Sequence, residues 1–476
     1  MVTTALYWYR QDLRLADLPA MRAAIDNGLK LIPCYVFDDA AAGQWSPGGA
    51  SRWWLHHSLA ALDTELAKRG SPLVVRRGET ARVLADLAAQ TGAEAVYCSE
   101  AIDPWARELQ SQVADALWET GVQLEARPSA LLFHPGTVCT QAGDPYRVFT
   151  PFWRACLQQP SPAEPLSAAS GKHFVEHDLD SLPHDDWQLL PRNPDWAAGW
   201  DELWSPGATG ARRALQHFLD NALDSYAEGR DFPAARSTSR LSPHLHFGEI
   251  SPRQVWHAVQ ALPEGQDKPA AKFLAEVGWR EFCHQLLYFN PEIPEKPFKA
   301  DFGEMPWLAD QTHLQAWQRG RTGYPIVDAG MRELWQTGFM HNRVRMIVAS
   351  FLTKHLLLPW QWGEQWFWDT LVDADLANNS CGWQWVAGCG ADAAPYFRIF
   401  NPILQGRKFD PDGEYVRQWV PEIASLPDKY LHAPWEAPAK ILAEAGVELG
   451  ETYPEPLVDH KEARETALQA YGVISG

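Results

Sequence analysis

The stretch ALYWYRQDLRLADLPAMRAAIDNGLKLIPCYVF (5–37) decides the fold of the first part of the chain. Two short runs rich in β-forming residues, 5–9 and 31–37, enclose a helical pattern at 17–27, and Gly28 follows where a helix C-cap is expected. Further strands are expected at 72–76, 94–98 and 122–126, further helices at 50–69, 80–91 and 103–120, and further C-caps at Gly70, Gly92 and Gly121. This alternation predicts a doubly wound parallel sheet, a Rossmann-like α/β domain over residues 1–128.

The sequence after this domain changes character twice. Residues 129–205 contain many prolines and little periodicity, which predicts a long interdomain linker that runs over the surface. Amphipathic helical patterns dominate residues 206–476, so we expect an all-helical second domain there. Its clearest helical patterns lie at 210–230, 251–262, 270–289, 313–320 and 327–339.

The composition restricts both the chemistry and the location. The seven cysteines form an odd set without a C-x-x-C pair, which argues against a disulfide framework and a structural zinc site, so no metal is expected. No apolar run approaches membrane-spanning length and the first residues lack a signal-peptide pattern, so we expect a cytoplasmic protein without a membrane partner. The net charge of −19 argues against a polyanionic partner, although a local basic face can persist within an acidic total.

The densest chemistry lies in DADLANNSCGWQWVAGCGADAAPYFRIFNP (373–402). Its acids and amides offer hydrogen-bonding groups, its two tryptophans offer stacking faces, and its arginine offers an anion fork. The residues concerned are Asp373, Asp375, Asn378, Asn379, Trp383, Trp385 and Arg398. One interpretation is a site for a flat ligand with polar edges. The alternative is a tryptophan-rich core whose Asp and Asn residues cap helices.

Three further motifs each allow a functional and a structural interpretation. The hydroxyls of TSRLS (238–242) suit a diphosphate cradle or an ordinary helix cap. In the 270–289 pattern, Arg280 lies four residues after Glu276, where an ion pair is available. HNRVRM (341–346) carries two arginines that point to different helix faces and could serve two partners or solvent. No G-x-S-x-G, H-E-x-x-H, P-loop or G-x-G-x-x-G motif is present, which favours chemistry supplied by a bound organic cofactor.

Taken together, these segments resemble the photolyase/cryptochrome family over nearly the whole chain. The motifs that carry the resemblance occur in the family's order and are LYWYRQDLRL (6–15), RDFPAARSTSRLSPHLHFGEIS (230–251), WREF (279–282), TGYPIVDAGMRELW (322–335), MHNRVRM (340–346), DADLANNSCGWQW (373–385) and DAAPYFRIFNP (392–402). The resemblance is nearest to bacterial photolyases that repair cyclobutane pyrimidine dimers in DNA. It implies an N-terminal antenna domain and a helical domain that binds FAD in a U shape.

The resemblance implies a set of FAD-binding positions. They are Tyr226, Thr238, Ser239, Leu241, Ser242, Arg280, Arg345, Asp373, Asp375 and Asn379. Arg345 would pair with Asp373, and Asp375 would accept from the isoalloxazine edge. Asn379 falls where the family faces flavin N5. Plant cryptochromes have Asp there, whereas Asn resembles the photolyase pattern that supports the fully reduced flavin.

The resemblance also implies residues that act on damaged DNA. The catalytic positions at the lesion and the flavin are Glu276, Trp279, Asn342, Met346, Trp385 and Asn379, and the phosphate-contacting positions are Arg230, Arg343, Arg398 and Lys408. The (6-4) photolyases have a histidine pair where this chain reads His341-Asn342, so Asn342 favours cyclobutane dimers. Trp383, Trp360 and Trp307 match the family's electron-transfer chain, and the alternative for these three residues is packing alone.

The sequence allows two alternatives for the second, antenna chromophore that the family binds. The segment IDPWARE (102–108) lacks the Asn-Glu found in one folate-binding subgroup, so the antenna is either a deazaflavin in a pocket with Arg52 and Asp103 or a reduced folate stacked on tryptophan. An iron-sulfur subgroup needs four cysteines in the helical domain. This chain has three there, Cys283, Cys381 and Cys389, so no cluster is expected.

The function implied is that of a deoxyribodipyrimidine photo-lyase, in which excited reduced FAD gives an electron to a flipped dimer and splits it. Its partner would be ultraviolet-damaged DNA, double- or single-stranded, and the enzyme would act as a monomer at the bacterial nucleoid. The alternative from another class is a cryptochrome-like blue-light photoreceptor without repair activity. A third hypothesis, a flavoprotein oxidoreductase, would turn over with a soluble reductant in darkness.

Overall fold

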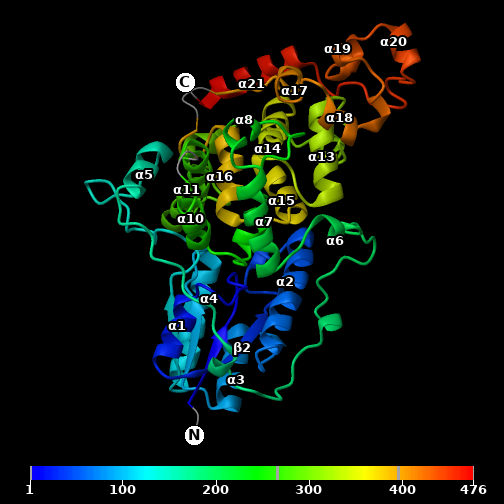
Figure 1. The fold of residues 1–476 in the computed structure, drawn as a ribbon. Coiled ribbons are helices and arrows are strands. Elements are labelled where there is room, and N and C mark those ends of the chain that lie inside the picture. The colour runs from blue at the N-terminus through cyan, green and yellow to red at the C-terminus, as the bar shows by residue number, and fades with distance from the viewer. Residues whose placement is uncertain (1–2, 264–266, 394–396, 475–476) are drawn as a thin grey trace. The chain divides into compact units, whose positions relative to one another are not determined.

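The computed structural model describes residues 3–263, 267–393 and 397–474. The chain divides into two compact units (Figure 1). Unit 1 consists of Met1–Asp195, Asp201–Asp224 and Ser239–Pro291, and unit 2 consists of Trp196–Trp200, Ser225–Thr238 and Glu292–Gly476. The predicted domain boundaries at residues 128 and 205 rest on changes in composition and periodicity along the sequence, not on compactness in space. They stay a prediction.

Five parallel strands form the sheet of unit 1. They are β1 (Thr4–Trp8), β2 (Lys30–Phe37), β3 (Val74–Arg77), β4 (Ala95–Ser99) and β5 (Gln123–Arg127). Their order is β3-β2-β1-β4-β5, and Ala5 of β1 lies opposite Leu31 on one side and Ala95 on the other. Leu6 and Tyr7 point to opposite faces and both are fully buried, so helices cover both faces, as in other parallel sheets. The predicted doubly wound sheet is confirmed.

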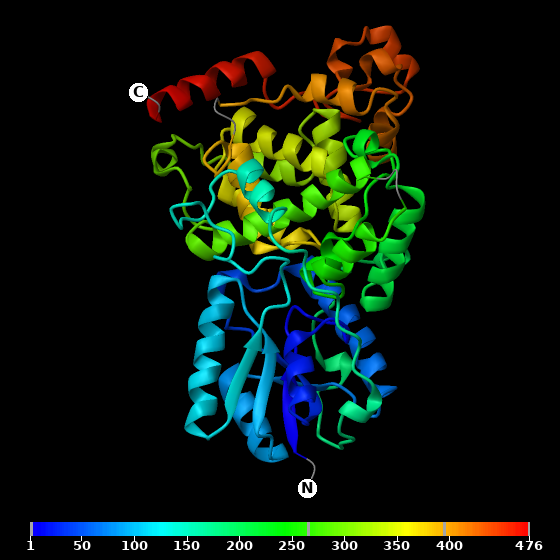
Figure 2. The same ribbon diagram turned by 60° about the vertical axis from the view of Figure 1, so that its left-hand side comes forward.

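Four helices alternate with these strands, as the sequence predicts (Figures 1 and 2). They are α1 (Pro19–Asp26), α2 (Gly49–Ala67), α3 (Thr80–Thr91) and α4 (Pro104–Glu119). Apolar residues of α3 and α4, including Leu84 and Val113, share one core cluster with Leu6 of the sheet. Gly92 ends α3 in the left-handed region at φ +64°, a conformation that a side chain would strain.

The remaining helices of unit 1 follow the sheet in sequence. They are α5 (Phe149–Cys156), α7 (Ala208–Asn221), α9 (Ser242–His246), α10 (Pro252–Gln260) and α11 (Asp267–Phe289). The helix predicted at 210–230 is wrong as a single element, because α7 ends at Asn221 and a separate short helix, α8 (Tyr226–Gly229), follows. The chain turns between them so that Ala222 and Leu223 become buried, and this burial outweighs the continuous helical pattern.

Unit 2 is helical. Its main helices are α8, α12 (Gln311–Gln318), α13 (Pro325–Thr337), α14 (Asn342–Ser350), α15 (Trp360–Thr370), α16 (Leu376–Ala387), α17 (Pro402–Phe409), α18 (Glu414–Trp419) and α21 (His460–Ile474). Shorter elements are η4 (Ala300–Glu304), α19 (Asp428–Leu431), α20 (Ala439–Glu444) and η5 (Phe351–His355), a π-helical turn that continues α14. The all-helical prediction is therefore confirmed for the described part of this unit.

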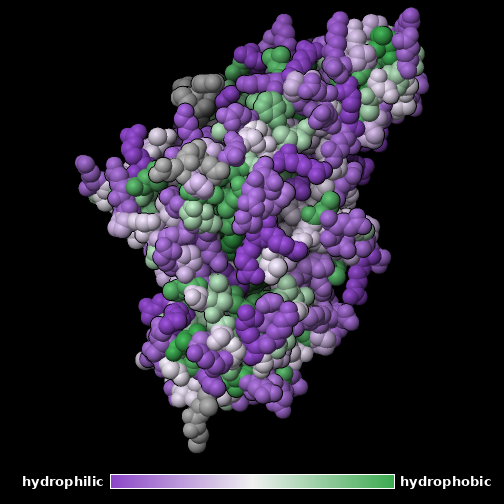
Figure 3. All heavy atoms as spheres, in the orientation of Figure 1, coloured by the Kyte–Doolittle hydropathy of each residue, from purple (hydrophilic) through white to green (hydrophobic). Residues whose placement is uncertain are grey.

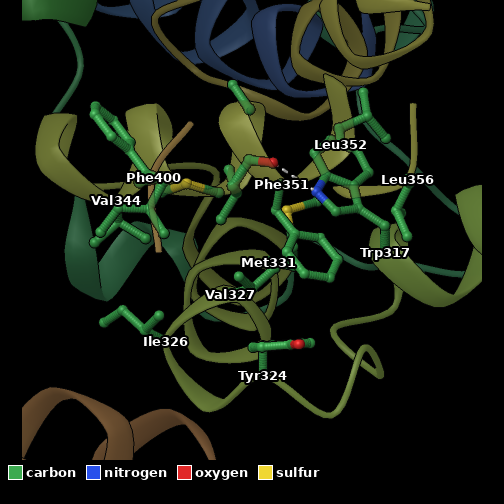
Figure 4. Packing of buried hydrophobic residues seen from close by; sticks show 14 of the residues in the cluster. Trp317, Tyr324, Ile326, Val327, Met331, Val344, Phe351, Leu352, Leu356 and Phe400 are labelled. Carbon is green, nitrogen blue, oxygen red and sulfur yellow. Dashed lines mark hydrogen bonds between the residues drawn. The ribbon is translucent and has the colours of Figure 1, made fainter. Parts of the chain in front are cut away.

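A large apolar core fixes α13 and α14 relative to each other (Figure 4). A Cβ atom added at Gly330 of α13 would lie 2.4 Å from a methyl carbon of Val344, so the two helices meet closely at this glycine. The indole N–H of Trp317 donates to the Val348 carbonyl at 3.0 Å, which satisfies a buried donor that would otherwise destabilise the core. This close packing therefore holds α14 in place, and the first turn of this helix carries three predicted site residues.

On the face drawn in Figure 3, hydrophilic residues predominate and hydrophobic residues lie among them. Among residues 3–263, 267–393 and 397–474, no helix combines the length and apolar character needed to cross a bilayer.

Candidate functional site

The predicted site residues are divided between the units. Glu276, Trp279, Arg280, Ser239, Leu241, Ser242, Arg52 and Asp103 belong to unit 1, and all the others belong to unit 2. Residues 394–396, within the stretch 373–402, lie outside the described residues.

The N-terminal end of α16 holds the two predicted acids. Arg345 of α14 donates from Nη2 to both carboxylate oxygens of Asp373, at 3.0 and 2.9 Å, so the ion pair expected between them is present. Asp375 is the N-cap of α16, and its Oδ1 accepts from the backbone N–H of Asn378 at 2.9 Å. The side-chain amide of Asn378 donates to the same oxygen at 2.6 Å, so Oδ1 of Asp375 serves both bonds of the cap.

Asn379 lies one turn further along α16 and is oriented by α15. Its Nδ2 donates to the backbone carbonyl of Glu364 at 3.0 Å, which directs Oδ1, the acceptor, away from that carbonyl. Ser380 donates its hydroxyl to the Glu364 carboxyl group. Glu364 is almost fully buried, and burial raises the pKa of this carboxyl well above its usual value, which favours the uncharged form. No sequence motif signalled Glu364, which lies among tryptophans in WQWGEQWFW (360–368).

Two of the three predicted electron-transfer tryptophans are core residues. Trp383 and Trp360 are 2% and 1% exposed, whereas Trp307 is half-buried and packs against the same cluster. The Trp383 ring lies 5.0 Å from the Phe367 ring, centroid to centroid, in an edge arrangement. A Cβ atom at Gly363 would lie 2.0 Å from the Trp383 ring, so a glycine is required where this indole crosses α15. The burial pattern is consistent with both packing and electron transfer toward the surface.

Trp385 points to a different environment from Trp383, as their spacing predicts. It is half-buried, and its indole N–H donates to the Asp392 carbonyl at 3.1 Å. The segment after α16 therefore returns to the edge of this indole and leaves part of its surface exposed.

The first turn of α14 presents polar side chains. His341 caps this helix, its Nδ1 accepting from the backbone N–H of Arg343 at 3.2 Å, and burial lowers its pKa to about 4. Asn342 is exposed and Met346 is half-buried. Arg343 pairs with Asp231 at 2.9 Å and lies over the Phe409 ring, so the two arginines of this motif have different partners, as expected.

The other predicted cations of unit 2 each lie over an aromatic ring. The guanidinium carbon of Arg230 is 5.4 Å from the Tyr226 ring centroid, and that of Arg398 is 4.8 Å from the Phe400 centroid. Nζ of Lys408 is 5.0 Å from the Phe409 centroid. Arg398 and Lys408 are exposed, so their charges remain accessible to an anion such as a DNA phosphate.

In unit 1, α11 carries the three predicted residues of this region. Trp279 is half-buried, and one face of its ring is covered by Phe149 in a parallel stack with centroids 3.9 Å apart. Arg280 donates to the Ala130 carbonyl at 2.8 Å and lies 3.6 Å from a Glu281 carboxylate oxygen. Glu276 is half-buried on the same helix. Phe282 also contacts Trp279 in an edge arrangement, with ring centroids 5.8 Å apart.

The segment before α9 carries most of the residues predicted to cradle the phosphates, and their role stays a prediction. Tyr226 and Leu241 are buried, whereas Thr238 and Ser239 are half-buried and Ser242 is exposed at the start of α9. Between them, Arg240 adopts a left-handed φ of +52°, a strained conformation for a residue other than glycine. Nothing in the TSRLS sequence signals this backbone conformation.

The two antenna candidates lie on different helices of unit 1. Arg52 is exposed on α2 and donates to the Gln188 carbonyl. Asp103 is buried and immediately precedes α4. Their role in a chromophore pocket stays a prediction.

Glu281 is a buried acid of unit 1 that the sequence did not single out. Its Oε2 accepts from the backbone N–H groups of Leu132 and Phe133, at 2.8 and 3.1 Å, and so holds this segment against α11. Burial raises the pKa of this carboxyl to about 7, despite the opposing influence of Arg280.

Because the folded-state pKa of Glu281 exceeds its unfolded value, the stability it contributes is complete below about pH 4.5 and is lost as the pH rises through about 7. We expect Glu281→Gln to remove about 3 kcal/mol of this pH dependence, since one pKa unit corresponds to about 1.4 kcal/mol. Urea unfolding of both proteins between pH 5 and 8 measures it. Parallel pH profiles for the two proteins would contradict the expectation.

Comparisons with protein families and with known proteins show which proteins this chain resembles. The model for the FAD-binding domain of DNA photolyase matches residues 273–473, and the DNA photolyase model matches residues 5–170. A deoxyribodipyrimidine photo-lyase of Agrobacterium fabrum is 50% identical over 470 residues, 98% of each chain. The chain belongs to the photolyase/cryptochrome family.

Two solved structures and a plant relative are also similar to this chain. A bacterial class III photolyase from Agrobacterium tumefaciens has a TM-score of 0.94 and 49% identity, covering 100% of this chain and 98% of that one. An archaeal photolyase from Sulfolobus tokodaii, described with two FAD molecules, has a TM-score of 0.83 and 30% identity, covering 99% and 100% of the two chains. Cryptochrome-1 of Arabidopsis thaliana is 38% identical over 98% of this chain and 70% of its own length. The predicted family, the two-part fold and FAD as cofactor are confirmed.

Proposed function

We propose that this chain is a deoxyribodipyrimidine photo-lyase that repairs cyclobutane pyrimidine dimers. When bound, reduced FAD would absorb light and supply the electron that splits the dimer, and the electron would return to the flavin, so that the reaction is redox-neutral overall. The protein's own task is to hold the flavin, bind the flipped lesion beside it and exclude water. The observation that supports repair over signalling is Asn379, whose amide is oriented by the Glu364 carbonyl.

The residues of unit 2 fit a reduced flavin chemically. Arg345 donates from Nη2 to both oxygens of the buried Asp373 and from Nε to the Met340 carbonyl, so the guanidinium is held in one orientation beside the proposed isoalloxazine position. The amide of Asn379 is a neutral group, and its Oδ1 can accept a hydrogen bond from a ring N–H. An Asp at this position would instead bring a titratable proton. This difference favours storage of the fully reduced cofactor.

A flipped dinucleotide needs stacking surfaces and hydrogen-bonding groups, and the predicted lesion residues offer both. In unit 2, Trp385 offers a stacking surface, Asn342 a hydrogen bond and Met346 an apolar contact to a flipped base. In unit 1, the face of Trp279 opposite Phe149 and the carboxyl group of Glu276 offer contacts of the same kinds. Arg230, Arg343, Arg398 and Lys408 would contact phosphates of the strand. These local cations reconcile DNA binding with the net charge of −19.

We propose further that Trp383, Trp360 and Trp307 carry electrons to oxidised flavin, because they run from two buried indoles to a half-buried one. The second chromophore is proposed to be a reduced folate or a deazaflavin near Arg52 and Asp103. A cytoplasmic monomer acting at the nucleoid completes the proposal.

A cryptochrome-like photoreceptor is the second candidate, and the 38% identity to a plant cryptochrome favours its consideration. Competition binding separates the two. We expect the FAD-loaded protein to bind a duplex with one thymine dimer about a thousandfold more tightly than the undamaged duplex, a difference typical of specific DNA recognition. Equal affinities for the two duplexes would favour the photoreceptor.

A further inference from the structure

Lys354 is a buried lysine for which neither the fold nor the proposed function yet accounts. It lies in the π-helical turn η5 and is 1% exposed. Burial lowers the pKa of its ammonium group well below the usual value, because the charged form is poorly solvated there. A buried lysine is costly, because an apolar residue of equal length would fill the same space without a polar group.

The amine makes two contacts that together account for its placement. Nζ donates to the backbone carbonyl of Ala387, and it lies 3.1 Å from the centroid of the Phe397 ring. The Ala387 carbonyl accepts one N–H of this group, and the Phe397 ring offers its face to the nitrogen. Phe397 is held in turn by Tyr471 of α21 in a parallel stack at 4.5 Å.

The two partners of Lys354 lie on either side of the segment that follows α16. Ala387 is the last residue of α16, where carbonyls have no donor within the helix. Phe397 immediately precedes Arg398, a predicted DNA contact. One side chain therefore joins the end of the helix that carries Trp385 to the residue next to Arg398.

The two halves of α16 are supported independently. Asn379 and Ser380 in the first half bond to Glu364 of α15. In the second half, Gln384 donates to the carbonyls of Ile293 and Lys296, at 2.7 and 2.8 Å, and Lys354 takes the last carbonyl. The proposed flavin contacts belong to the first half and the proposed lesion contact to the second.

We infer that Lys354 is a positioning residue for lesion binding, whose amine fixes Ala387 and Phe397 and thereby orients Trp385 and Arg398 toward damaged DNA. The inference rests on the proposed function for its DNA-binding consequence. It requires that loss of the amine affect the second half of α16 and spare the first.

Lys354→Met tests this, because methionine keeps most of the apolar stem and removes the donor. We expect the Kd for a dimer-containing duplex to rise about tenfold, the equivalent of about 1.4 kcal/mol. FAD content, the rate of flavin photoreduction and the midpoint of thermal unfolding should stay at or above the values of the unchanged protein. Lys354→Gln, which keeps an N–H donor, should recover part of the affinity.

Lys299→Met is the matched control, since Lys299 is exposed and donates to the neighbouring Gly388 carbonyl at 3.1 Å. It should leave the affinity unchanged, because exposed contacts of this kind contribute little. An unchanged affinity in a folded Lys354→Met protein would overturn the inference. So would a joint fall in affinity, FAD content and photoreduction, because that result would mean general damage to the core.

Hydrogen exchange without DNA separates this inference from the proposed function. In Lys354→Met, the amides of Gly390 and Phe400, which bond to Gln384 and Ser350, should exchange faster, while the Asn379 amide should not change. Unchanged exchange at Gly390 and Phe400 would overturn the positioning role. If the unchanged protein shows no preference for damaged DNA, the proposed function fails, while the exchange result still decides whether Lys354 fixes this segment.

Discussion

Trp360→Phe will nearly abolish the light-driven reduction of oxidised flavin. Trp360 is 1% exposed and is the middle member of the proposed chain between Trp383 and Trp307. Phenylalanine fills most of the same volume, but its ring is much harder to oxidise than indole, so the electron path is broken while the core is kept. The rate is measured as loss of oxidised-flavin absorbance under blue light with an external thiol present.

Trp362→Phe on the same helix is the control, because Trp362 packs against the same core but is not in the proposed chain. It should reduce flavin at the normal rate. A normal rate in Trp360→Phe would remove this residue from the path and would leave packing as its role. Chemically reduced Trp360→Phe should still repair DNA, since the chain loads the cofactor and takes no part in splitting the dimer.

Glu276→Ala will reduce the number of dimers split per absorbed photon at least about tenfold, because a hydrogen bond to a charged group contributes about 1.5–3 kcal/mol. Glu276 is half-buried on α11, three residues before Trp279. In the proposal it hydrogen-bonds the base edge on which negative charge develops. The yield is measured on fully reduced protein at saturating dimer DNA, so that weaker binding does not enter the result.

Glu276→Gln keeps a hydrogen-bonding side chain and should fall between the two proteins. Glu108→Ala, on α4 with an exposed side chain, should leave the yield unchanged. An unaltered yield in Glu276→Ala would show that Glu276 has no part in the splitting step.

The sequence predicted the sheet well because strand and helix periodicity are local properties. The runs at 5–9 and 31–37 became β1 and β2 within one residue of their expected starts. The break between α7 and α8 was missed because it depends on burial of Leu223, a tertiary effect that leaves no local signal. The strained Arg240 was missed for the same reason.

In the site, the family motifs predicted the Arg345–Asp373 pair, which the structure contains. They did not predict what holds these residues in place. Glu364 and Lys354 are ionisable residues that sequence patterns assign to the surface, yet both are 1% exposed and act as hydrogen-bonding groups toward the two ends of α16. Such roles depend on the three-dimensional surroundings, because burial is the main cause that shifts both pKa values toward the uncharged form.

The most direct test of the account is the loss of cyclobutane dimers from irradiated DNA incubated with the FAD-loaded, reduced protein, under blue or near-ultraviolet light and in darkness. The account predicts that dimers disappear over many turnovers in the light and persist in the dark. Persistence of the dimers in the light, with FAD bound and reduced, would contradict it.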